Sequence, residues 1–249
     1  MSGQLGEKVA LVTGAVRRNG RAIAHALARE GADVVINTRQ SRDEAEKARA
    51  EIERIGRRSL VCVADISDEN AVKRMFDEIT TQFGRLDILV NNAADRGITP
   101  FTEMTTAQWR HILDIVLDGS FFCARAAVPH MLKNGWGRIV NISGLSHHAP
   151  NYLGRVHVST AKAGLEGFTR GLAAELAKKN ITVNCVCPGR IGGERSATSS
   201  EMPDPGMVPP VGHLGVPDDI AGAVHFLCLP GSGFITGHTL HVNGGQILL

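Results

Sequence analysis

The sequence predicts an α/β fold in which a single doubly wound parallel sheet carries helices on both faces. Short apolar runs alternate with helix-length amphipathic segments along the whole chain, and no internal repeat or low-complexity block interrupts them. The strand-like runs are almost continuously apolar, which is typical of strands buried on both faces of a parallel sheet. With 249 residues, 43% of them hydrophobic, the chain can bury one core, and we expect a single domain over residues 1–249.

Each element follows from its own local pattern. The strands are predicted at 8–13, 33–38, 59–63, 86–90, 138–142, 182–186 and 239–242. The helices are predicted at 20–30, 43–55, 68–83, 107–132, 158–179 and 218–229. In the segment 158–179, for example, Leu165, Phe168 and Leu172 recur at spacings of three and four residues, so they form a stripe that faces the core.

Charge and hydropathy exclude several classes of protein. The 27 Lys and Arg residues nearly balance the 25 Asp and Glu residues, so the net charge of +2 gives little support to nucleic-acid binding. The apolar runs fall far short of the roughly 18 residues that span a membrane. The start of the chain also lacks the apolar stretch of an export signal. We expect a cytoplasmic protein that acts on a small-molecule substrate, with neither nucleic acid nor membrane as a partner.

The cysteines and histidines show no metal-binding pattern in the sequence. The five cysteines are an odd number and no pair has the two-residue spacing of a zinc knuckle, so we expect reduced, mostly buried thiols. Cys185 and Cys187 would point to one face of a strand as ordinary core residues. His238 and His241 flank the last strand and are interpreted as structural, so no metal site is expected.

A glycine-containing turn joins the first strand to the first helix. Residues 13–20 read Thr-Gly-Ala-Val-Arg-Arg-Asn-Gly. Glycines permit a tight turn and the close approach of a pyrophosphate, and the free amides of the following helix N-terminus bind phosphate. The alternative is a purely structural turn, but its place in the first βα unit favours a nucleotide site. The predicted cofactor-binding residues of this turn are Gly14, Arg17, Arg18, Asn19 and Gly20.

The end of the second strand indicates which nucleotide is bound. Thr38 and Arg39 stand where an NAD-binding chain would usually place a carboxylate for the ribose 2′-hydroxyl. An arginine there suits a 2′-phosphate instead, and Arg17 could face the same group. The sequence therefore predicts NADP(H), with solvated surface arginines as the alternative.

Together with later stretches, this turn resembles the classical short-chain dehydrogenase/reductases, and the resemblance covers the whole chain. The stretches that carry it are 13–20, Asp65-Ile66, Asn91-Asn92-Ala93-Ala94, Asn141-Ile142-Ser143, Lys162, Pro188-Gly189 and 237–245. The resemblance implies a Rossmann-like domain that binds NADP(H). It also implies a homotetramer in which the helices at 107–132 and 158–179 pack against their symmetry mates.

Positions that match the family's cofactor-binding residues can be carried over one by one. They are Asp65 and Ile66 at the adenine, Asn91 and Ala93 at the frame of the cleft, Lys162 at the nicotinamide ribose, and Pro188, Gly189 and Ile191 at the nicotinamide. One departure lies in the turn, where Arg18 occupies the place of the second glycine. A subset that resembles pteridine reductases also carries arginine there and uses NADP(H), so this departure supports the same cofactor.

The catalytic set departs further from the family, which normally uses Asn, Ser, Tyr and Lys. Val116 stands at the Asn position, Gly144 at the Ser position and Val158 at the Tyr position, so that Lys162 alone is kept. A positioned general acid is worth about 10² to 10⁴ in rate, or roughly 3 to 5 kcal/mol of barrier. Reduction of a simple ketone would therefore be slow unless another group supplies the proton.

Four residues are the candidates for catalysis: Lys162, Ser143, His148 and Tyr152. His147 and His148 follow Ser143 in a segment that borders the substrate pocket in this family, and a histidine can act as acid or base near neutral pH. The alternative for both is a loop position facing water or a neighbouring subunit. Tyr152 is the only tyrosine and lies ten residues before Lys162, so a loop or interface anchor is the simpler interpretation. The neighbouring His157 is turned by about 100° from the vacated Tyr position and is a poor surrogate.

Two functions remain open at this stage. The first is an NADP(H)-dependent oxidoreductase that reduces an imine, an iminium or an activated alkene, because these reactions do not need the lost tyrosine. The second is a non-redox enzyme, or a catalytically inactive cofactor-binding protein, on the same fold. The segment at about 190–212 corresponds to the family's substrate lid, but its Ser, Pro and Gly content does not identify a substrate.

Overall fold

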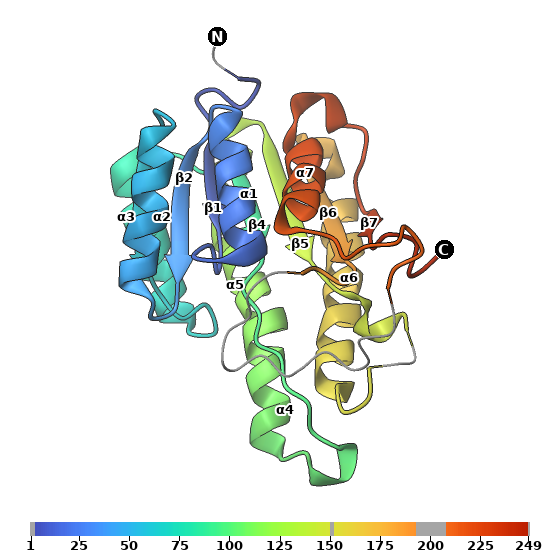
Figure 1. Cartoon of the computed structure of the whole chain (residues 1–249). Helices are drawn as coiled ribbons and strands as arrows, with labels where there is room; N and C mark the ends of the chain where they lie inside the picture. Colours follow the sequence, from blue (N-terminus) through green and yellow to red (C-terminus); the bar gives the residue numbers. More distant parts are fainter. Residues whose placement is uncertain (1–2, 150–151, 193–207, 249) are drawn as a thin grey trace.

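The computed structural model describes residues 3–149, 152–192 and 208–248, and these residues contain a seven-stranded parallel sheet (Figure 1). The strand order is β3-β2-β1-β4-β5-β6-β7, and every neighbouring pair is parallel. The strands are β1 (Val9–Val12), β2 (Asp33–Thr38), β3 (Ser59–Val63), β4 (Ile88–Asn91), β5 (Gly137–Ile142), β6 (Ile181–Pro188) and β7 (Thr239–Val242). This is the doubly wound, Rossmann-like sheet that the sequence predicts.

Helices cover both faces of the sheet. One face carries α1 (Arg18–Arg29), α2 (Arg42–Arg54) and α7 (Pro217–Cys228), and the other carries α3 (Glu69–Phe83), α5 (Gly119–Asn134) and α6 (Val156–Leu176). The helix α4 (Thr106–Leu113) lies beyond the carboxyl ends of the strands in Figure 1. Each face therefore has its own apolar layer between sheet and helices, which is why the strands are apolar on both sides.

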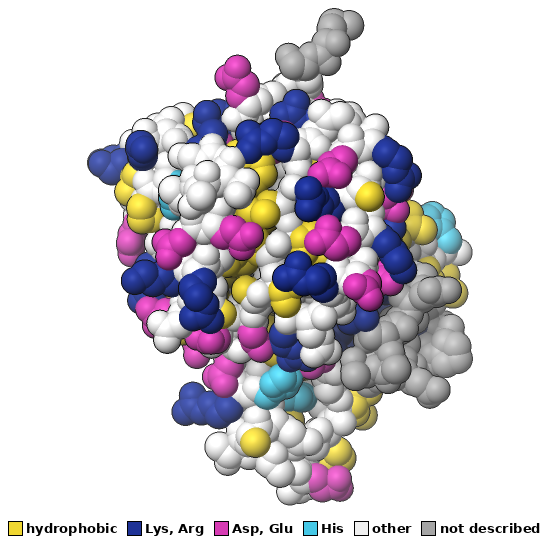
Figure 2. Space-filling model, turned by 90° about the vertical axis from the view of Figure 1, so that its left-hand side faces the viewer, with side chains coloured by type: hydrophobic (Ala, Val, Ile, Leu, Met, Phe, Trp, Pro, Cys, Tyr) yellow, Lys and Arg dark blue, Asp and Glu magenta, His cyan; other side chains and the backbone are white. Residues whose placement is uncertain are grey.

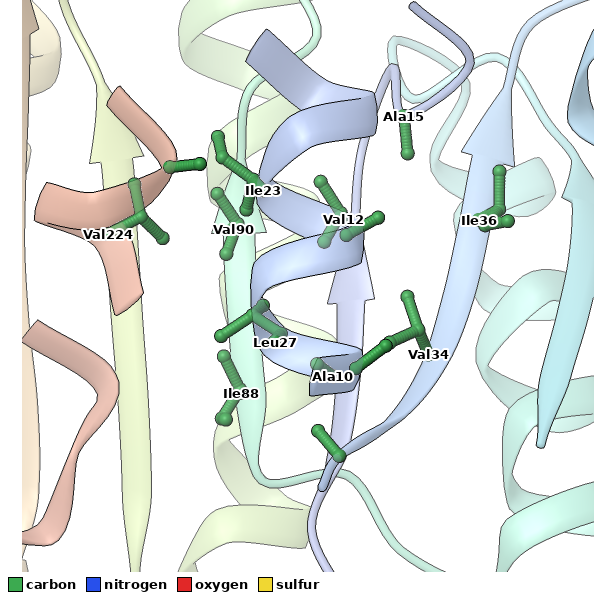
Figure 3. Packing of buried hydrophobic residues seen from close by; sticks show 14 of the residues in the cluster. Ala10, Val12, Ala15, Ile23, Leu27, Val34, Ile36, Ile88, Val90 and Val224 are labelled. Atoms are coloured by element: carbon green, nitrogen blue, oxygen red, sulfur yellow. The ribbon is translucent and has the colours of Figure 1, made fainter. Parts of the chain in front are cut away.

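The packing of α1 shows how the amphipathic pattern becomes a core. Ile23 and Leu27 lie one turn apart on α1 and point at the strands beneath, where Figure 3 shows them beside Val12 and Val90. All four side chains are fully buried. Burial of such a side chain contributes about 1.5 to 3 kcal/mol, so this spacing fixes the helix on the sheet.

The predicted elements are all found, and most of their ends shift by one or two residues. The exception is the long helix expected at 107–132. There the structure has α4 and α5 joined by a π-helical segment at Asp114–Asp118. A π turn contains one residue more than an α-helical turn. Within this segment, the Ser120 hydroxyl donates a hydrogen bond of 2.7 Å to the Val116 carbonyl. Periodicity alone does not reveal such a segment.

The topology places a crevice at the carboxyl ends of β1 and β4. These strands are neighbours in the sheet, but the chain leaves β1 toward one sheet edge and β4 toward the other. Loops at such a switch point diverge and leave room for a ligand. On the face shown in Figure 2, Lys and Arg side chains are interspersed with Asp and Glu. Among the described residues, no helix is both long and apolar enough to cross a bilayer.

Candidate active site

The turn after β1 is tied to the end of β4 by a compact hydrogen-bond set. The backbone amides of Asn92 and Ala93 donate to the Thr13 hydroxyl at 2.9 and 3.0 Å. The Asn92 side chain donates in turn to the Thr13 and Gly14 carbonyls at 2.8 and 3.1 Å. The motif at 91–94 therefore holds the glycine turn in place, and Asn92 is a residue that sequence reasoning quoted without giving it a role.

Two glycines of the turn are required by the geometry. Gly14 has φ of +61°, and a Cβ on it would lie 3.0 Å from the Ala93 Cα. A Cβ on Gly20 would lie 2.3 Å from the Gly14 carbonyl oxygen. The backbone at these two positions is thus packed too closely for a side chain, as expected of a turn that binds phosphate.

A cleft opens at the switch point and contains most of the predicted cofactor residues. It is lined by the turn residues Gly14, Arg17, Arg18, Asn19 and Gly20, by Thr38 and Arg39 after β2, by Asp65 and Ile66 after β3, and by Ala93 after β4. The first turn of α1 contains no acidic residue. Its N-terminal dipole and the arginines therefore give this end of the cleft a positive potential.

The arginines of the cleft differ in their surroundings. Arg17 and Arg39 are exposed. The positive charge of Arg39 is one of the influences that lower the pKa of Asp95 across the cleft. Arg18 is partly buried with φ of +48°, and its guanidinium donates to the Ile191 carbonyl at 3.0 Å. Arg18 therefore also links the turn to the loop after β6.

Five predicted cofactor positions lie outside the residues that line this cleft. They are Asn91, Lys162, Pro188, Gly189 and Ile191. The Asn91 side chain is buried and donates to Asn141 at 2.8 Å. A Cβ on Gly189 would lie 2.5 Å from the Asn243 Cα, so this glycine is needed where β6 and β7 end side by side. Most of the expected lid, residues 193–207, lies outside the described residues.

Val116 and Val158, two of the three positions predicted to have lost a catalytic side chain, lie in one apolar cluster. Val116 and Val158 are 1% and 5% exposed, and they pack together with Ile112, Ala161 and Leu165. Gly144 follows β5 in an extended conformation, and a Cβ added there would meet nothing within 4 Å. Two hydrocarbon groups and an open space thus occupy the three positions at which the resemblance predicts the loss of the family's Asn, Tyr and Ser.

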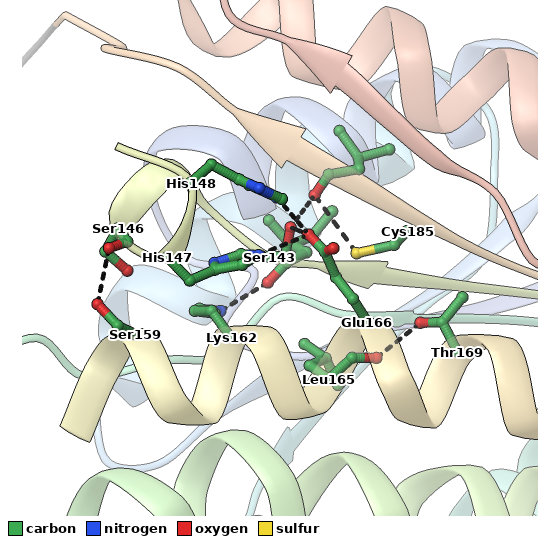
Figure 4. A network of polar contacts seen from close by, with 12 residues as sticks. Ser143, Ser146, His147, His148, Ser159, Lys162, Leu165, Glu166, Thr169 and Cys185 are labelled. Atoms are coloured by element: carbon green, nitrogen blue, oxygen red, sulfur yellow. Dashed lines mark hydrogen bonds and ion pairs between the residues drawn. The ribbon is translucent and has the colours of Figure 1, made fainter. Parts of the chain in front are cut away.

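A buried carboxylate, Glu166, organises the polar groups beside this cluster (Figure 4). Its Oε1 accepts from the Ser143 hydroxyl at 3.0 Å and lies 3.0 and 3.2 Å from the Nε2 atoms of His147 and His148. Figure 4 shows both imidazoles turned inward toward α6, so the alternative of loop histidines facing water is wrong for these residues. Their side chains are only 10% and 18% exposed.

The pKa of Glu166 reflects these partners. Burial raises it, but the hydrogen bond and charge of His147, with the hydrogen bonds of His148 and Ser143, outweigh burial and lower the pKa to about 2. Sequence reasoning missed Glu166 although a signal existed. It lies four residues after Lys162 and eight after Val158, so a helix places all three on one face.

Lys162 lies next to this network without joining it. Its Nζ donates to the Ile142 carbonyl at 2.6 Å and the side chain is buried. Burial, with the charge of Arg96, lowers the pKa of Lys162 to about 8. The amine is therefore held at the end of β5, one residue from Ser143, and loses its proton more readily than an exposed lysine.

Tyr152 is not brought into the network by any contact among the described residues. Its ring lies under the Arg155 guanidinium at 5.6 Å, which fits the interpretation as an anchor at the start of α6. His157 is buried, with its Nε2 facing Gly97, and burial followed by the Arg155 charge lowers its pKa. Of the four candidate catalytic residues, the structure thus gathers Ser143, His148 and Lys162 and leaves Tyr152 apart.

His241, which the sequence analysis interprets as a structural residue, lies beside the two histidines of the turn after β5. The ring centroids of His147 and His148 are 3.9 Å apart, and those of His148 and His241 are 5.0 Å apart. The cause is tertiary: the ends of β5 and β7 lie on either side of β6, so residues almost a hundred positions apart meet. The expectation for the cysteines holds, since all five are described, buried and unpaired.

Comparison with known proteins agrees with this geometry. Residues 14–246 match a family model described as enoyl-(acyl carrier protein) reductase. The chain is 41% identical to (2S)-[(R)-hydroxy(phenyl)methyl]succinyl-CoA dehydrogenase subunit BbsD of Thauera aromatica, over 97% of each chain. It is 39% identical to 3-oxoacyl-[acyl-carrier-protein] reductase FabG of Staphylococcus aureus, over 97% of this chain and 98% of that one.

Solved structures show the same relationship. A proposed short-chain alcohol dehydrogenase from Sinorhizobium meliloti 1021 has a TM-score of 0.87 at 35% identity, over 97% of this chain and 96% of the other. Acetoin dehydrogenase YohF from Salmonella typhimurium has a TM-score of 0.86 at 33% identity, over 96% and 95%. The chain therefore belongs to the classical short-chain dehydrogenase/reductase family.

Proposed function

We propose that this protein is an NADP(H)-dependent oxidoreductase that transfers hydride to an imine, an iminium or an activated alkene. The observation that carries the proposal is the replacement of the proton-donating set by an apolar cluster. Val116 and Val158 are packed against each other and Gly144 leaves an open space, whereas the cleft that would hold the cofactor keeps its glycine turn and its arginines. Relatives named as reductases and dehydrogenases support redox chemistry over the non-redox alternative.

The cleft fits a dinucleotide with a 2′-phosphate. Asn19 lines it, and the Asn19 Oδ1 is buried without a hydrogen-bond partner among the described residues, so it is ready to accept from a ligand. The amides at the start of α1 would hold the pyrophosphate. Arg17 and Arg39, with Thr38, would hold the 2′-phosphate by charge-assisted hydrogen bonds.

The rest of the cofactor would follow the sheet toward β6. Asp65 and Ile66 would flank the adenine, Ala93 and Asn91 the middle of the cleft, and Lys162 the nicotinamide ribose. The nicotinamide would lie against the loop after β6, at Pro188, Gly189 and Ile191. When bound, the cofactor supplies a hydride.

The proposed substrates match the chemistry of the remaining groups. An imine becomes an iminium by taking a proton from water. Hydride addition to the iminium carbon then gives a neutral amine without proton transfer in that step. In an activated alkene, hydride adds to the β-carbon and the α-carbon then takes a proton from water. A simple ketone differs, because its oxygen becomes a localised alkoxide that a nearby acid must neutralise, whereas the enolate formed from the alkene is delocalised and a much weaker base.

A matched substrate panel tests this proposal. One carbon skeleton is offered as a ketone, a cyclic imine and an α,β-unsaturated ketone, and NADPH oxidation is followed for each. We expect turnover of the imine or the unsaturated ketone at a rate at least about 10² above that of the simple ketone. If NADPH is not oxidised with any of the three compounds, the result favours the non-redox enzyme or the inactive cofactor-binding protein.

The proposed assembly is a homotetramer. Phe121 and Leu132 on α5 are 42% and 45% exposed, and Val156 at the start of α6 is 42% exposed. Large apolar side chains on these two helices fit burial against symmetry mates, as the resemblance to the family implies. Light scattering coupled to size-exclusion chromatography measures the assembly directly.

A further inference from the structure

Three potential metal ligands from distant parts of the chain meet at the carboxyl ends of β5, β6 and β7. Cys187 and His241 are register partners on the neighbouring parallel strands β6 and β7, which places their side chains on the same face of the sheet. His148 comes from the turn that follows β5. One ligand atom from each residue lies within 4.8 Å of those of the other two.

We propose that Cys187, His148 and His241 form a binding site for a divalent transition-metal cation, with Zn²⁺ as the best match. A thiolate and two imidazoles are ligands that Zn²⁺ binds at about 2.0 to 2.3 Å in tetrahedral geometry. Ligand atoms at those bond lengths lie about 3.4 to 3.7 Å apart, so small side-chain movements close the group around a cation. Oxygen-preferring cations such as Mg²⁺ and Ca²⁺ do not suit this donor set.

An unpartnered nitrogen supports the site independently of the distances. The Nδ1 atom of His241 is buried and has no hydrogen-bond partner among the described residues. A buried polar atom without a partner is costly, so native structures nearly always satisfy it with protein, water or an ion. A cation held with Cys187 would satisfy this nitrogen.

The surroundings of His148 complete the arrangement found around metal-binding histidines. Its Nε2 is 3.2 Å from the Glu166 Oε1, so in the proposed site its Nδ1 would bind the cation. A carboxylate on the far nitrogen orients a metal-binding imidazole and strengthens it as a ligand. The other possible group, made by His147, His148 and Glu166, is less suitable because the atoms that meet there already bond to one another at 3.0 and 3.2 Å.

The position of the site links it to the altered acid set. Glu166, the partner of His148, also holds Ser143, which directly precedes Gly144. Three protein ligands leave the fourth position of a tetrahedral cation for water or a substrate atom. A cation here would therefore act as a Lewis acid close to the end of β5. The link runs from His148 to Glu166 and from Glu166 to Ser143, the residue before the family's serine position. This consequence rests on the proposed function, but the binding site itself does not.

Metal binding is tested on the tag-free, metal-stripped full chain. Zn²⁺ is titrated in competition with a chromophoric chelator, and Co²⁺ is titrated while the absorption spectrum is recorded. We expect one equivalent of Zn²⁺ per chain and a sulfur-to-cobalt charge-transfer band. Glu166→Gln should weaken Zn²⁺ binding by about 10- to 100-fold, and Cys187→Ser should weaken it more.

The chain offers matched control variants for two of the three ligands, Cys187 and His241. Cys185→Ser changes a second buried cysteine on the same strand face, and His238→Ala changes an exposed histidine directly before β7. Both should bind Zn²⁺ like the unmodified protein. His241→Ala lies on the edge strand and keeps the test valid if Cys187→Ser does not fold.

Three results would overturn the proposal outright, and a fourth would do so by moving the cation to another group. The first three are the absence of stoichiometric Zn²⁺ binding, a Co²⁺ complex without the sulfur band, and equal Zn²⁺ affinity in Cys187→Ser and Cys185→Ser. Loss of binding only in His147→Gln would assign the cation to the Glu166 group and would also overturn it. A separate NADPH titration of the metal-free protein distinguishes failure of this site from failure of the proposed function.

Discussion

Restoring the missing acid should convert the protein toward ketone reduction. The perturbation is the double substitution Gly144→Ser and Val158→Tyr. The serine fits because a Cβ on Gly144 meets nothing within 4 Å and the backbone there is extended. Position 158 lies one helical turn before Lys162 on the same face of α6, so a tyrosine there can act together with the retained lysine.

The magnitude follows from two opposing effects. A positioned general acid is worth about 10² to 10⁴ in rate, or roughly 3 to 5 kcal/mol of barrier. A larger ring at a position that is 5% exposed costs about 1 to 3 kcal/mol of stability if it stays within the apolar cluster. This second effect lowers the free energy of unfolding but does not change the rate of the molecules that remain folded.

The assay compares NADPH-dependent reduction of one ketone by the original protein and by the double variant. The matched control carries Gly144→Ser with Val158→Phe, which adds the same ring without its hydroxyl. We expect a rate increase of at least about 10² in the tyrosine variant and none in the control. An unchanged rate in a folded variant that still binds NADPH would refute the idea that the acid set alone limits ketone reduction.

Three further predictions concern the cofactor cleft, the buried carboxylate and the glycine turn. Arg39→Ala should weaken NADPH binding by about 1.5 to 3 kcal/mol and leave NADH binding unchanged, measured by fluorescence titration of both cofactors. The pKa of Glu166 is lowered from 4.5 to about 2, so its ionised form stabilises the fold above about pH 4.5 and this stabilisation is lost as the pH falls toward 2. The difference in Tm between the original protein and Glu166→Gln should therefore narrow over that range, and a constant difference would contradict it. Gly20→Ala should lower the free energy of unfolding by about 1 to 3 kcal/mol in urea titration, since its Cβ would lie 2.3 Å from a carbonyl oxygen. Gly167→Ala is the control, because it lies exposed on α6 with open space around its Cβ and should be neutral or stabilising.

The fold could be predicted from the sequence because its signals are local and repeated. The strand Asp33–Thr38 has its predicted limits and is buried throughout, since a run of apolar residues bounded by polar ones defines a buried strand. The glycine turn and the arginine after β2 were also predictable, because their chemistry follows from adjacent residues. The π segment at Asp114–Asp118 was not predictable, since it shifts the helical register by one residue without changing the apolar pattern.

The polar half of the site was only partly predictable, for a physical reason. Ser143 and His148 were identified because they lie at or after the end of the strand at 138–142, and Lys162 was identified from the resemblance to the family. Glu166 sits in a helix, where a single acidic residue suggests a solvated position. The meeting of His241 with His148 depends on the order of β5, β6 and β7 in the sheet. Such contacts across strands have no signature in sequence spacing.

The most direct test of the account is a side-by-side titration of the purified protein with NADPH and NADH, followed by fluorescence or calorimetry. The arginines that line the cleft predict clear preference for NADPH, because each charge-assisted contact to a 2′-phosphate is worth about 1.5 to 3 kcal/mol. We expect NADPH to bind at micromolar concentration and NADH at least about 10-fold more weakly. Equal or tighter binding of NADH would contradict the assignment of these arginines, and binding of neither would contradict the oxidoreductase itself.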